Sequence, residues 1–216
     1  MNGAGKSEPL TAARLRSAVR SLAAVDPLMG RIFDEYGEPP LWNRPPGFAT
    51  LLHIILEQQV SLASAKACFD KLNARVGTIE PNSLLQLAEP ELKAVGFSRQ
   101  KMSYAKHLAE AVLDGRFDFS AVHKMDDAEA KAELTKLKGV GIWTADIYLI
   151  MAMLRPDVMP KGDIALHAAW HKVSGIGRPD ADEFQVIAER WAPHRSTAAR
   201  LLWHFYLSSR KNKMKL

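Results

Sequence analysis

Apolar residues recur at helical spacing along most of this 216-residue chain, and this pattern constrains the fold more than any other feature. Leu15, Val19 and Leu22, for example, lie three or four positions apart. No segment alternates apolar and polar side chains between turn signals, as a half-buried strand would. The sequence therefore predicts an all-α protein.

Helix start signals are clear at several points of the chain. Asp26 followed by Pro27 is typical of an N-cap residue and the first helical position. Ser61 and Ser98 likewise precede helical patterns and are expected to cap them. The segment FATLLHIIL at residues 48–56 is apolar on almost every side, which predicts a buried helix.

The proline-rich segment EPPLWNRPPG, residues 38–47, interrupts the helical pattern. It is too rich in proline for a helix or an inner strand, so we expect a connector at a lobe boundary. The expected parts of the chain are a flexible tail (1–10), a helical domain (11–209) with one lobe at about 48–155 and a second at about 11–47 plus 156–209, and a basic tail (210–216).

Composition limits the class of protein. The formal charge of +5 and the pI near 9.3 favour a polyanionic partner, although a merely solvated basic surface has the same signature. The single cysteine, Cys68, excludes an internal disulfide and a four-cysteine iron–sulfur cluster, so we expect no such cofactor. No apolar run approaches the roughly 20 residues of a membrane span, and the N-terminus lacks a signal-peptide core, so we expect a cytoplasmic protein.

The turn L-K-G-V-G at residues 137–141 separates two helical patterns. Glycines let the chain turn sharply and bring the unpaired N–H groups of the following helix close to a ligand, most often a phosphate. Such a contact would position a nucleic acid without reading its sequence. The alternative is a tight helical corner whose glycines serve packing alone.

Blocks on both sides of this turn resemble, in the same order, those of the 3-methyladenine DNA glycosylase II family of the helix-hairpin-helix (HhH-GPD) DNA glycosylase superfamily. The resemblance is to the compact form of the family. The blocks are LHIILEQQVSLASAKACFDKL (52–72), VGFSRQKMSYAKHLAEAV (95–112), LKGVGIWTADIYLIMAML (137–154) with Asp163 after it, and ERWAPHRSTAARLLWHF (189–205). The resemblance implies a two-lobed helical fold with a DNA-binding cleft between the lobes, into which a base is flipped.

By its position, Asp163 takes the place of the catalytic carboxylate of the family. A carboxylate near C1′ of the sugar stabilises the positive charge that develops when the glycosidic bond breaks. The position before the helical pattern DIALHAAW suits this role, because helix N–H groups favour a negative charge. The structural alternative is a plain N-cap, and both roles can coexist.

Trp143 lies 20 residues before Asp163 (163 minus 143), where bifunctional relatives place a lysine that attacks the sugar. Tryptophan cannot form a Schiff base, so the resemblance implies a monofunctional glycosylase without a lyase step. The indole is expected to stack on an extruded, electron-poor base. A core tryptophan that bridges two helices is the alternative.

Four further residues belong to the base pocket that the resemblance implies. Trp42, in the connector, and Tyr148 are aromatic candidates, with ordinary packing as the alternative for both. Ile147 and Ile164 stand where some relatives have aromatic residues, so the pocket is expected to be more aliphatic. The preference among alkylated bases therefore stays open.

DNA contacts are expected from the loop near residue 59 and from the hairpin. Gln58 and Gln59 are both expected to contact DNA, and the resemblance implies that Gln59 fills the gap left by the flipped nucleotide. An ordinary polar helix end is the alternative for both residues. Ser61 is expected to cap the next helix and to offer its N-terminus to phosphate. The hairpin residues expected to bind DNA are Gly139, Val140, Gly141 and Thr144, and the backbone expected to hold a monovalent cation is that of Leu137 and Gly139.

The expected function is therefore that of a monofunctional DNA glycosylase in base excision repair. It would flip alkylated purines of the 3-methyladenine and 7-methylguanine type out of double-stranded DNA and hydrolyse the N-glycosidic bond, leaving an abasic site. We expect a monomer in the bacterial cytosol or nucleoid. The alternatives are a glycosylase for another damaged or mismatched base, a noncatalytic helix-hairpin-helix DNA-binding module, and a helical protein-interaction domain.

Overall fold

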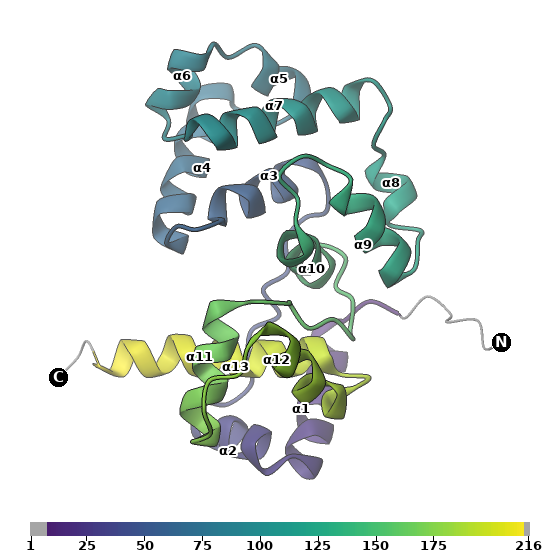
Figure 1. Ribbon diagram of the computed structural model, residues 1–216, viewed down its shortest axis with the longest axis vertical. Coiled ribbons are helices and arrows are strands. Elements are labelled where there is room, and N and C mark those ends of the chain that lie inside the picture. The colour runs from purple at the N-terminus through teal and green to yellow at the C-terminus, as the bar shows by residue number, and fades with distance from the viewer. Residues whose placement is uncertain (1–7, 214–216) are drawn as a thin grey trace. The chain divides into compact units, whose positions relative to one another are not determined.

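The computed structural model describes residues 8–213, with side chains as far as Arg210 (Figure 1). Its regular structure is entirely helical over this range, which confirms the all-α prediction. The elements are α1 (Ala12–Val25), α2 (Pro27–Tyr36), α3 (Phe48–Glu57), α4 (Leu62–Val76), α5 (Pro81–Leu85), α6 (Glu89–Ala94), α7 (Arg99–Leu113), α8 (Phe119–Val122), α9 (Asp127–Thr135), α10 (Ile142–Met151), α11 (Ile164–Ser174), α12 (Ala181–Ala188), η1 (Glu189–Trp191) and α13 (Arg195–Lys213).

The chain divides into two compact units. The terminal unit is described over residues 8–43 and 154–213, and the central unit comprises residues 44–153. The chain passes from the terminal unit to the central unit in the connector, where residues 38–46 form no helix. It returns to the terminal unit just after α10. The central unit is thus one continuous stretch, whereas the terminal unit is assembled from both ends of the chain.

The central unit is built around α3. Leu51, Leu52, Ile54 and Ile55 of this helix are each 0% exposed, as expected for a helix that is apolar on almost every side. Helices α4, α7 and α10 pack against it, and Figure 1 shows α7 running across this unit beside α5. The short helix α8, which was not predicted although Asp118 caps it, leads into α9.

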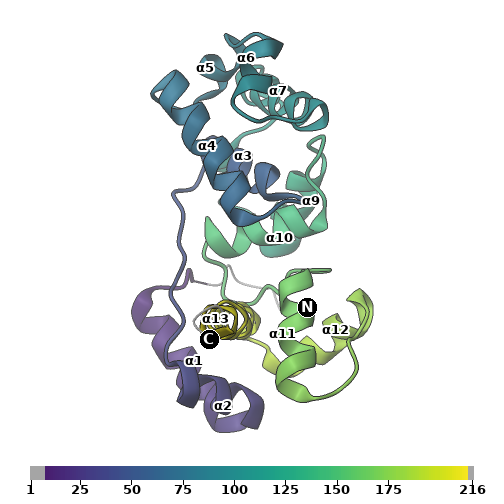
Figure 2. The same cartoon turned by 90° about the vertical axis from the view of Figure 1, so that its left-hand side faces the viewer.

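The terminal unit is organised around α13. Figure 2 looks nearly along this helix, with α1 and α2 on one side of it and α11 and α12 on the other. Trp191, just before α13, is 1% exposed, and its indole N–H donates to Oδ2 of Asp26 at 2.7 Å. Oδ1 of Asp26 accepts from the N–H of Leu28 at 2.9 Å, so the predicted N-cap of α2 is confirmed and also ties the helix to Trp191.

Two other predicted caps are confirmed as well. Ser61 accepts from the N–H of Ser64 at 3.1 Å at the start of α4. Ser98 accepts from the N–H of Lys101 at 3.2 Å at the start of α7. These bonds span three residues, which is why the local sequence predicts them.

The predicted tails differ from the structure where the structure describes them. Leu10 is 3% exposed, and its N–H donates to the carbonyl of Leu154 at 2.7 Å, so residue 10 belongs to the packed unit. Helix α13 continues through Arg210 to Lys213, because its buried residues extend as far as Ser209. The remainder of both predicted tails, residues 1–7 and 214–216, lies outside the described residues. Over residues 8–213 no helix is long and apolar enough to cross a membrane.

Candidate functional site

Asp163 lies at the N-terminus of α11, where its side chain caps the helix. Its Oδ1 atom accepts from the N–H of Leu166 at 2.9 Å and from the indole N–H of Trp203 at 3.3 Å. The residue is only 7% exposed. Two donors and the positive end of a helix therefore orient the carboxylate and stabilise its negative charge.

Trp203 is a site residue that the sequence analysis missed. It lies on α13, and its only sequence signal is that a buried indole N–H needs an acceptor. The Trp42 ring meets the Trp203 ring edge-on, with centroids 6.4 Å apart. Trp42, Trp203 and Asp163 therefore form one cluster within the terminal unit, which we call the carboxylate cluster.

The connector is held in place beside this cluster. Trp42 has a φ of 48°, in the left-handed region that side chains rarely occupy. The preceding carbonyl, that of Leu41, accepts from Nε of Arg200 at 3.0 Å, and Arg200 is 0% exposed. Burial lowers the pKa of the Arg200 guanidinium to about 10, so it stays charged at neutral pH. A buried cation thus fixes the backbone from which Trp42 projects.

The first turns of α11 place two more side chains near Asp163 in sequence. Ile164, the next residue, is 72% exposed. His167, one helical turn further on, is 6% exposed and lies against Phe184, with ring centroids 4.8 Å apart. Burial lowers the pKa of His167, so its imidazole is neutral at neutral pH.

The hairpin between α9 and α10 uses its two glycines differently. Gly139 has a φ of 86°, and a Cβ there would lie 2.2 Å from Cγ of Tyr104, so both backbone and packing require glycine. Gly141, the N-cap of α10, has a φ of −88°, and a Cβ there would meet nothing within 4 Å. The space beside Gly141 at the start of α10 is therefore open, and the helix has no side-chain cap there.

The side chain of Gln58 holds the hairpin backbone in place through two hydrogen bonds. Its side-chain amide donates to the carbonyl of Gly139 at 2.8 Å and to Oγ1 of Thr144 at 2.9 Å. Thr144 is 2% exposed. Gln58 and Thr144 were predicted to contact DNA, and in the structure these hydrogen bonds place their polar groups where they position the hairpin. Val140 is also internal, being 4% exposed, and its N–H donates to the carbonyl of Leu137.

The loop between α3 and α4 presents Gln59 at the surface. This residue is exposed and has a φ of 57°, an unusual conformation for a residue other than glycine. Its neighbours Val60 and Leu62 are 47% and 59% exposed, and Ser61 caps α4. Backbone strain of this kind costs about 1–3 kcal/mol and is often found at functional positions.

Helix α10 carries the remaining predicted pocket residues. Trp143 is half-buried, next to Ile142, which is 50% exposed. Ile147 and Tyr148 are 4% and 0% exposed, and the Tyr148 hydroxyl accepts from the N–H of Gly47 at 2.9 Å. Packing in the core of the central unit is therefore the role that the structure gives both residues, because a buried hydroxyl needs such a partner.

The structure brings the predicted residues together in two groups. The carboxylate cluster, with Ile164, belongs to the terminal unit. Trp143, the hairpin and the Gln59 loop belong to the central unit. No group of three or more histidine, cysteine, aspartate or glutamate side chains within the described residues could hold a metal ion.

Residues 52–194 match the HhH-GPD superfamily base excision DNA repair protein family. Among curated relatives, the chain is 24% identical over 184 residues to the putative DNA-3-methyladenine glycosylase YfjP of Bacillus subtilis. The matched region covers 81% of this chain and 64% of that protein, so the chain spans just under two thirds of this relative.

Two solved structures share the fold. The crystal structure of a DNA-3-methyladenine glycosidase from Bacillus halodurans is 28% identical, with a TM-score of 0.75, covering 90% of this chain and 91% of that one. The Schizosaccharomyces pombe 3-methyladenine DNA glycosylase Mag1, solved in complex with abasic DNA, is 24% identical, with a TM-score of 0.80, covering 90% of this chain and 97% of that one. Since the family match spans well over half of the sequence, the chain belongs to the HhH-GPD superfamily of base excision DNA repair proteins.

Proposed function

We propose that this chain is a monofunctional DNA glycosylase that releases alkylated purines from double-stranded DNA and leaves an abasic site. The observation that carries the proposal is the carboxylate of Asp163, oriented by the N–H of Leu166 and the indole of Trp203. The substrate class that we propose is alkylated purines of the 3-methyladenine and 7-methylguanine type, and 3-methyladenine in the names of the relatives from the two Bacillus species supports it.

The chemistry requires little more than this carboxylate. As the C1′–N bond breaks, its electron pair leaves with the base and positive charge develops on the sugar. Asp163 stabilises that charge, and a water molecule then bonds to C1′ and loses a proton to the carboxylate or to solvent. A purine alkylated at N3 or N7 carries a positive charge, so it departs as a neutral base without a proton from a general acid.

Trp143 determines the outcome of the reaction in this proposal. An indole has no basic amine, so no Schiff base forms with the sugar at this position, and the product is an intact abasic site. A cationic base is attracted to the face of an aromatic ring, which suits Trp143 as a stacking partner.

Double-stranded DNA containing damaged bases is the proposed partner, and the DNA complex of the S. pombe structure supports it. The open first turn of α10 at Gly141 would take a backbone phosphate, and Gln59 would enter the duplex. The carbonyls of Leu137 and Gly139 each accept one hydrogen bond and keep a second lone pair, so both remain candidates for a monovalent cation. We place the protein as a monomer in the compartment that holds the DNA, the cytoplasm or nucleoid in a bacterium.

Substitution of Asp163 by asparagine tests the proposal. Asparagine caps helices as well as aspartate, so Asp163→Asn removes the charge and leaves the cap. The matched control is Asp180→Asn at the N-cap of α12, where the side chain accepts from the N–H groups of Asp182 and Glu183. Release of methylated purines from alkylated duplex DNA is measured by chromatography.

We expect the wild type and Asp180→Asn to release methylated purines at similar rates. Asp163→Asn should be slower by a factor of about 10³ or more, with DNA affinity changed only a few-fold. Equal rates for wild type and Asp163→Asn would remove this carboxylate from the mechanism. Absence of release by the wild type, with DNA binding retained, would favour a noncatalytic DNA-binding module.

A further inference from the structure

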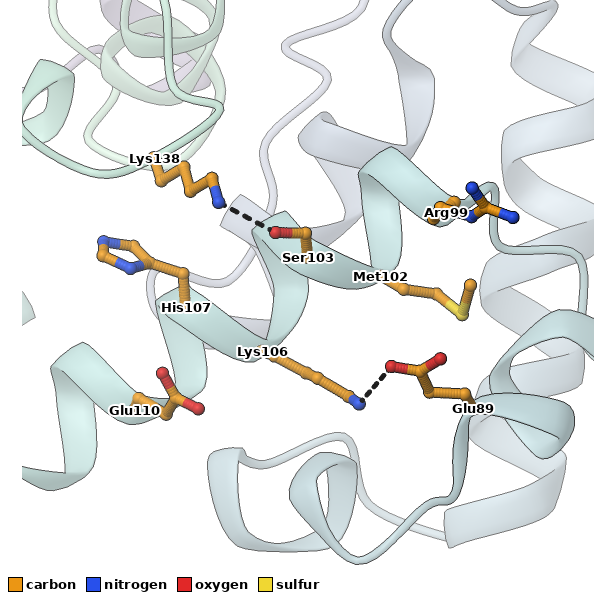
Figure 3. Close-up of a pocket in the computed structure, with 8 residues that line it drawn as sticks. All are labelled: Glu89, Arg99, Met102, Ser103, Lys106, His107, Glu110 and Lys138. Carbon is orange, nitrogen blue, oxygen red and sulfur yellow. Dashed lines mark hydrogen bonds and ion pairs between the residues drawn. The ribbon is translucent and has the colours of Figure 1, made fainter.

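A groove of about 320 Å³ runs along one face of α7 in the central unit (Figure 3). Helix α7 contributes most of its lining, α6 contributes Glu89, and the hairpin contributes Lys138. The lining residues are Glu89, Arg99, Met102, Ser103, Lys106, His107, Glu110 and Lys138. None of them has a role in the proposed chemistry or in the hairpin contact described above.

The charges in this groove are unevenly distributed. Nζ of Lys106 pairs with Oε1 of Glu89 at 3.2 Å, so these two charges balance each other. Nζ of Lys138 donates to the uncharged Oγ of Ser103 at 3.0 Å, and Arg99 forms no ion pair with a described residue. Figure 3 shows Lys138, Ser103 and Arg99 along one edge of the groove and the two glutamates along the other. We call the first of these the basic edge.

The start of α7 adds to the positive potential at this edge. A helix N-terminus carries partial positive charge and favours acidic residues, yet the first turn of α7 contains none. Arg99 occupies its first position instead, and it is exposed. Lys101, two residues on, donates to the carbonyl of Leu56 at 2.6 Å and so serves the fold. Arg99 has no such contact, and a charge placed against the local preference indicates a function.

The groove is fixed to the hairpin. Gly139 packs on the ring of Tyr104, which lies on α7 one residue after Ser103. Lys138 is the hairpin residue directly before Gly139, and its side chain reaches Ser103. The basic edge and the hairpin therefore belong to one packed assembly within the central unit, with Lys138 only three residues before Gly141.

We propose that the basic edge binds the phosphate backbone of the DNA strand that the hairpin holds, beyond the phosphate at Gly141, through the ammonium of Lys138 and the guanidinium of Arg99. The Ser103 hydroxyl, which accepts from Lys138 at 3.0 Å, can donate its own hydrogen to the phosphate that Lys138 binds. The contact is independent of base sequence and adds to the affinity for damaged and undamaged DNA alike. It rests on the proposed function only in that the hairpin must bind DNA.

The salt dependence of DNA binding tests this inference. Affinity for an undamaged duplex is measured by fluorescence anisotropy over a series of salt concentrations, for the wild type and for Arg99→Gln with Lys138→Gln. Loss of each phosphate contact should lower the slope of log K against log salt by about 0.9. The matched control is Lys93→Gln with Lys124→Gln, which removes the same charge from two exposed lysines of the central unit that form no ion pair with a described residue.

A substitution that should strengthen DNA binding distinguishes the proposed effect from a loss of folding. Glu110→Gln removes an exposed carboxylate from the groove, so it should tighten binding to the undamaged duplex at low salt. Unchanged slopes in the Arg99 and Lys138 double variant, or an equal fall in the Lys93 and Lys124 control, would overturn the proposal.

A titration with inorganic phosphate at constant ionic strength distinguishes the source of the anion. If amide signals of α7 shift with phosphate while the double variant keeps the wild-type DNA slope, the groove is a free-phosphate site and the DNA proposal is wrong. Base release by the wild type is scored separately. A reduced slope in the double variant without base release by the wild type would support the groove and reject the glycosylase.

Discussion

The two groups of candidate site residues are constructed in opposite ways. In the carboxylate cluster of the terminal unit, side chains form the site: the indole of Trp203 donates to Asp163, and the ring of Trp42 lies against that indole. In the hairpin of the central unit, backbone groups form the site, and Gln58 and Tyr104 only hold that backbone in place. Hydrolysis at one sugar carbon needs a carboxylate held in a fixed orientation. Binding to DNA of any sequence instead needs hydrogen-bond donors that do not distinguish the bases.

The largest expected effect separates the two hairpin glycines. Gly139→Ala places a side chain at a φ of 86° and against the ring of Tyr104, so it should cost about 2–5 kcal/mol of unfolding free energy. Gly141→Ala has neither problem and should change stability by less than about 0.5 kcal/mol. Urea denaturation followed by circular dichroism measures both.

The variants Gly139→Ala and Gly141→Ala also test whether the hairpin binds DNA. The Cβ of Gly141→Ala would occupy space that is open at the first turn of α10, so this variant should bind duplex DNA more weakly although it folds normally. A Gly141→Ala protein with wild-type DNA affinity would contradict the phosphate contact at this turn.

The next effect concerns the carboxylate cluster. Trp203→Phe keeps an aromatic ring against Trp42 but removes the donor to Asp163, a hydrogen bond to a charged group worth about 1.5–3 kcal/mol. We expect kcat for base release to fall about 10- to 100-fold with KM nearly unchanged.

Trp191→Phe is the matched control for this prediction. It removes a similar bond, from the indole N–H to Asp26 at 2.7 Å, elsewhere in the terminal unit. This variant should lose stability and keep its turnover. If both variants slow base release equally, the effect of Trp203→Phe reflects folding and not the orientation of the carboxylate.

The adjacent residues Gln58 and Gln59 allow a comparison in which the expected changes in stability are smaller. Gln58→Leu leaves the carbonyl of Gly139 and the hydroxyl of Thr144 without their donor and should cost about 1–2 kcal/mol. Gln59→Gly relieves a φ of 57° and should leave stability unchanged or raise it by up to about 1 kcal/mol. Thermal unfolding measures the two variants together. Slower base release in the stable Gln59→Gly protein would support an insertion role, and an unaffected rate would contradict it.

The smallest expected effect is a pH dependence present in both units. Burial lowers the pKa of His53 in the central unit and of His167 in the terminal unit. The unfolded chain takes up protons at these imidazoles near the ordinary value of about 6.5, and the folded chain only at lower pH. The unfolded state therefore binds more protons in that window, so stability is present above about pH 6.5 and falls as the pH drops through it.

Each histidine contributes a slope of at most about 1.4 kcal/mol per pH unit. Urea denaturation at several pH values, for the wild type, His53→Gln and His167→Gln, measures these slopes. Each variant should show a shallower loss of stability on acidification than the wild type. A variant that loses stability as steeply as the wild type would show that its histidine is not responsible.

Features that depend on neighbouring residues were predictable from sequence. The caps at Asp26, Ser61, Ser98 and Asp163 each bond to an N–H two or three residues ahead, so helix geometry alone fixes the partner. The apolar segment at 48–56 became the buried helix α3 for the same local reason, since it has no polar face to turn to solvent.

The partners of the polar side chains at the site were not predictable in this way. Gln58 bonds to groups 81 and 86 residues away, and Trp203 is 40 residues from Asp163. A buried amide or indole must find an acceptor, but the sequence does not say which one. Gln58 and Thr144 were predicted to contact DNA and Tyr148 to line the base pocket, with ordinary packing as the alternative for Tyr148. The contacts that the structure adds are all within the protein, such as the bond from the N–H of Gly47 to the Tyr148 hydroxyl.

The sequence by itself determined that this chain is helical, where several of its helices begin, and, through the order of its blocks, which superfamily it belongs to. Only the tertiary structure decided that Trp203 orients Asp163, that Gln58 braces the hairpin, and that Arg99 and Lys138 share one edge of a groove. Helix starts follow from hydrogen bonds within one turn of the chain, which the local sequence specifies. The pairing of distant side chains follows from how whole helices pack, which depends on the entire buried surface.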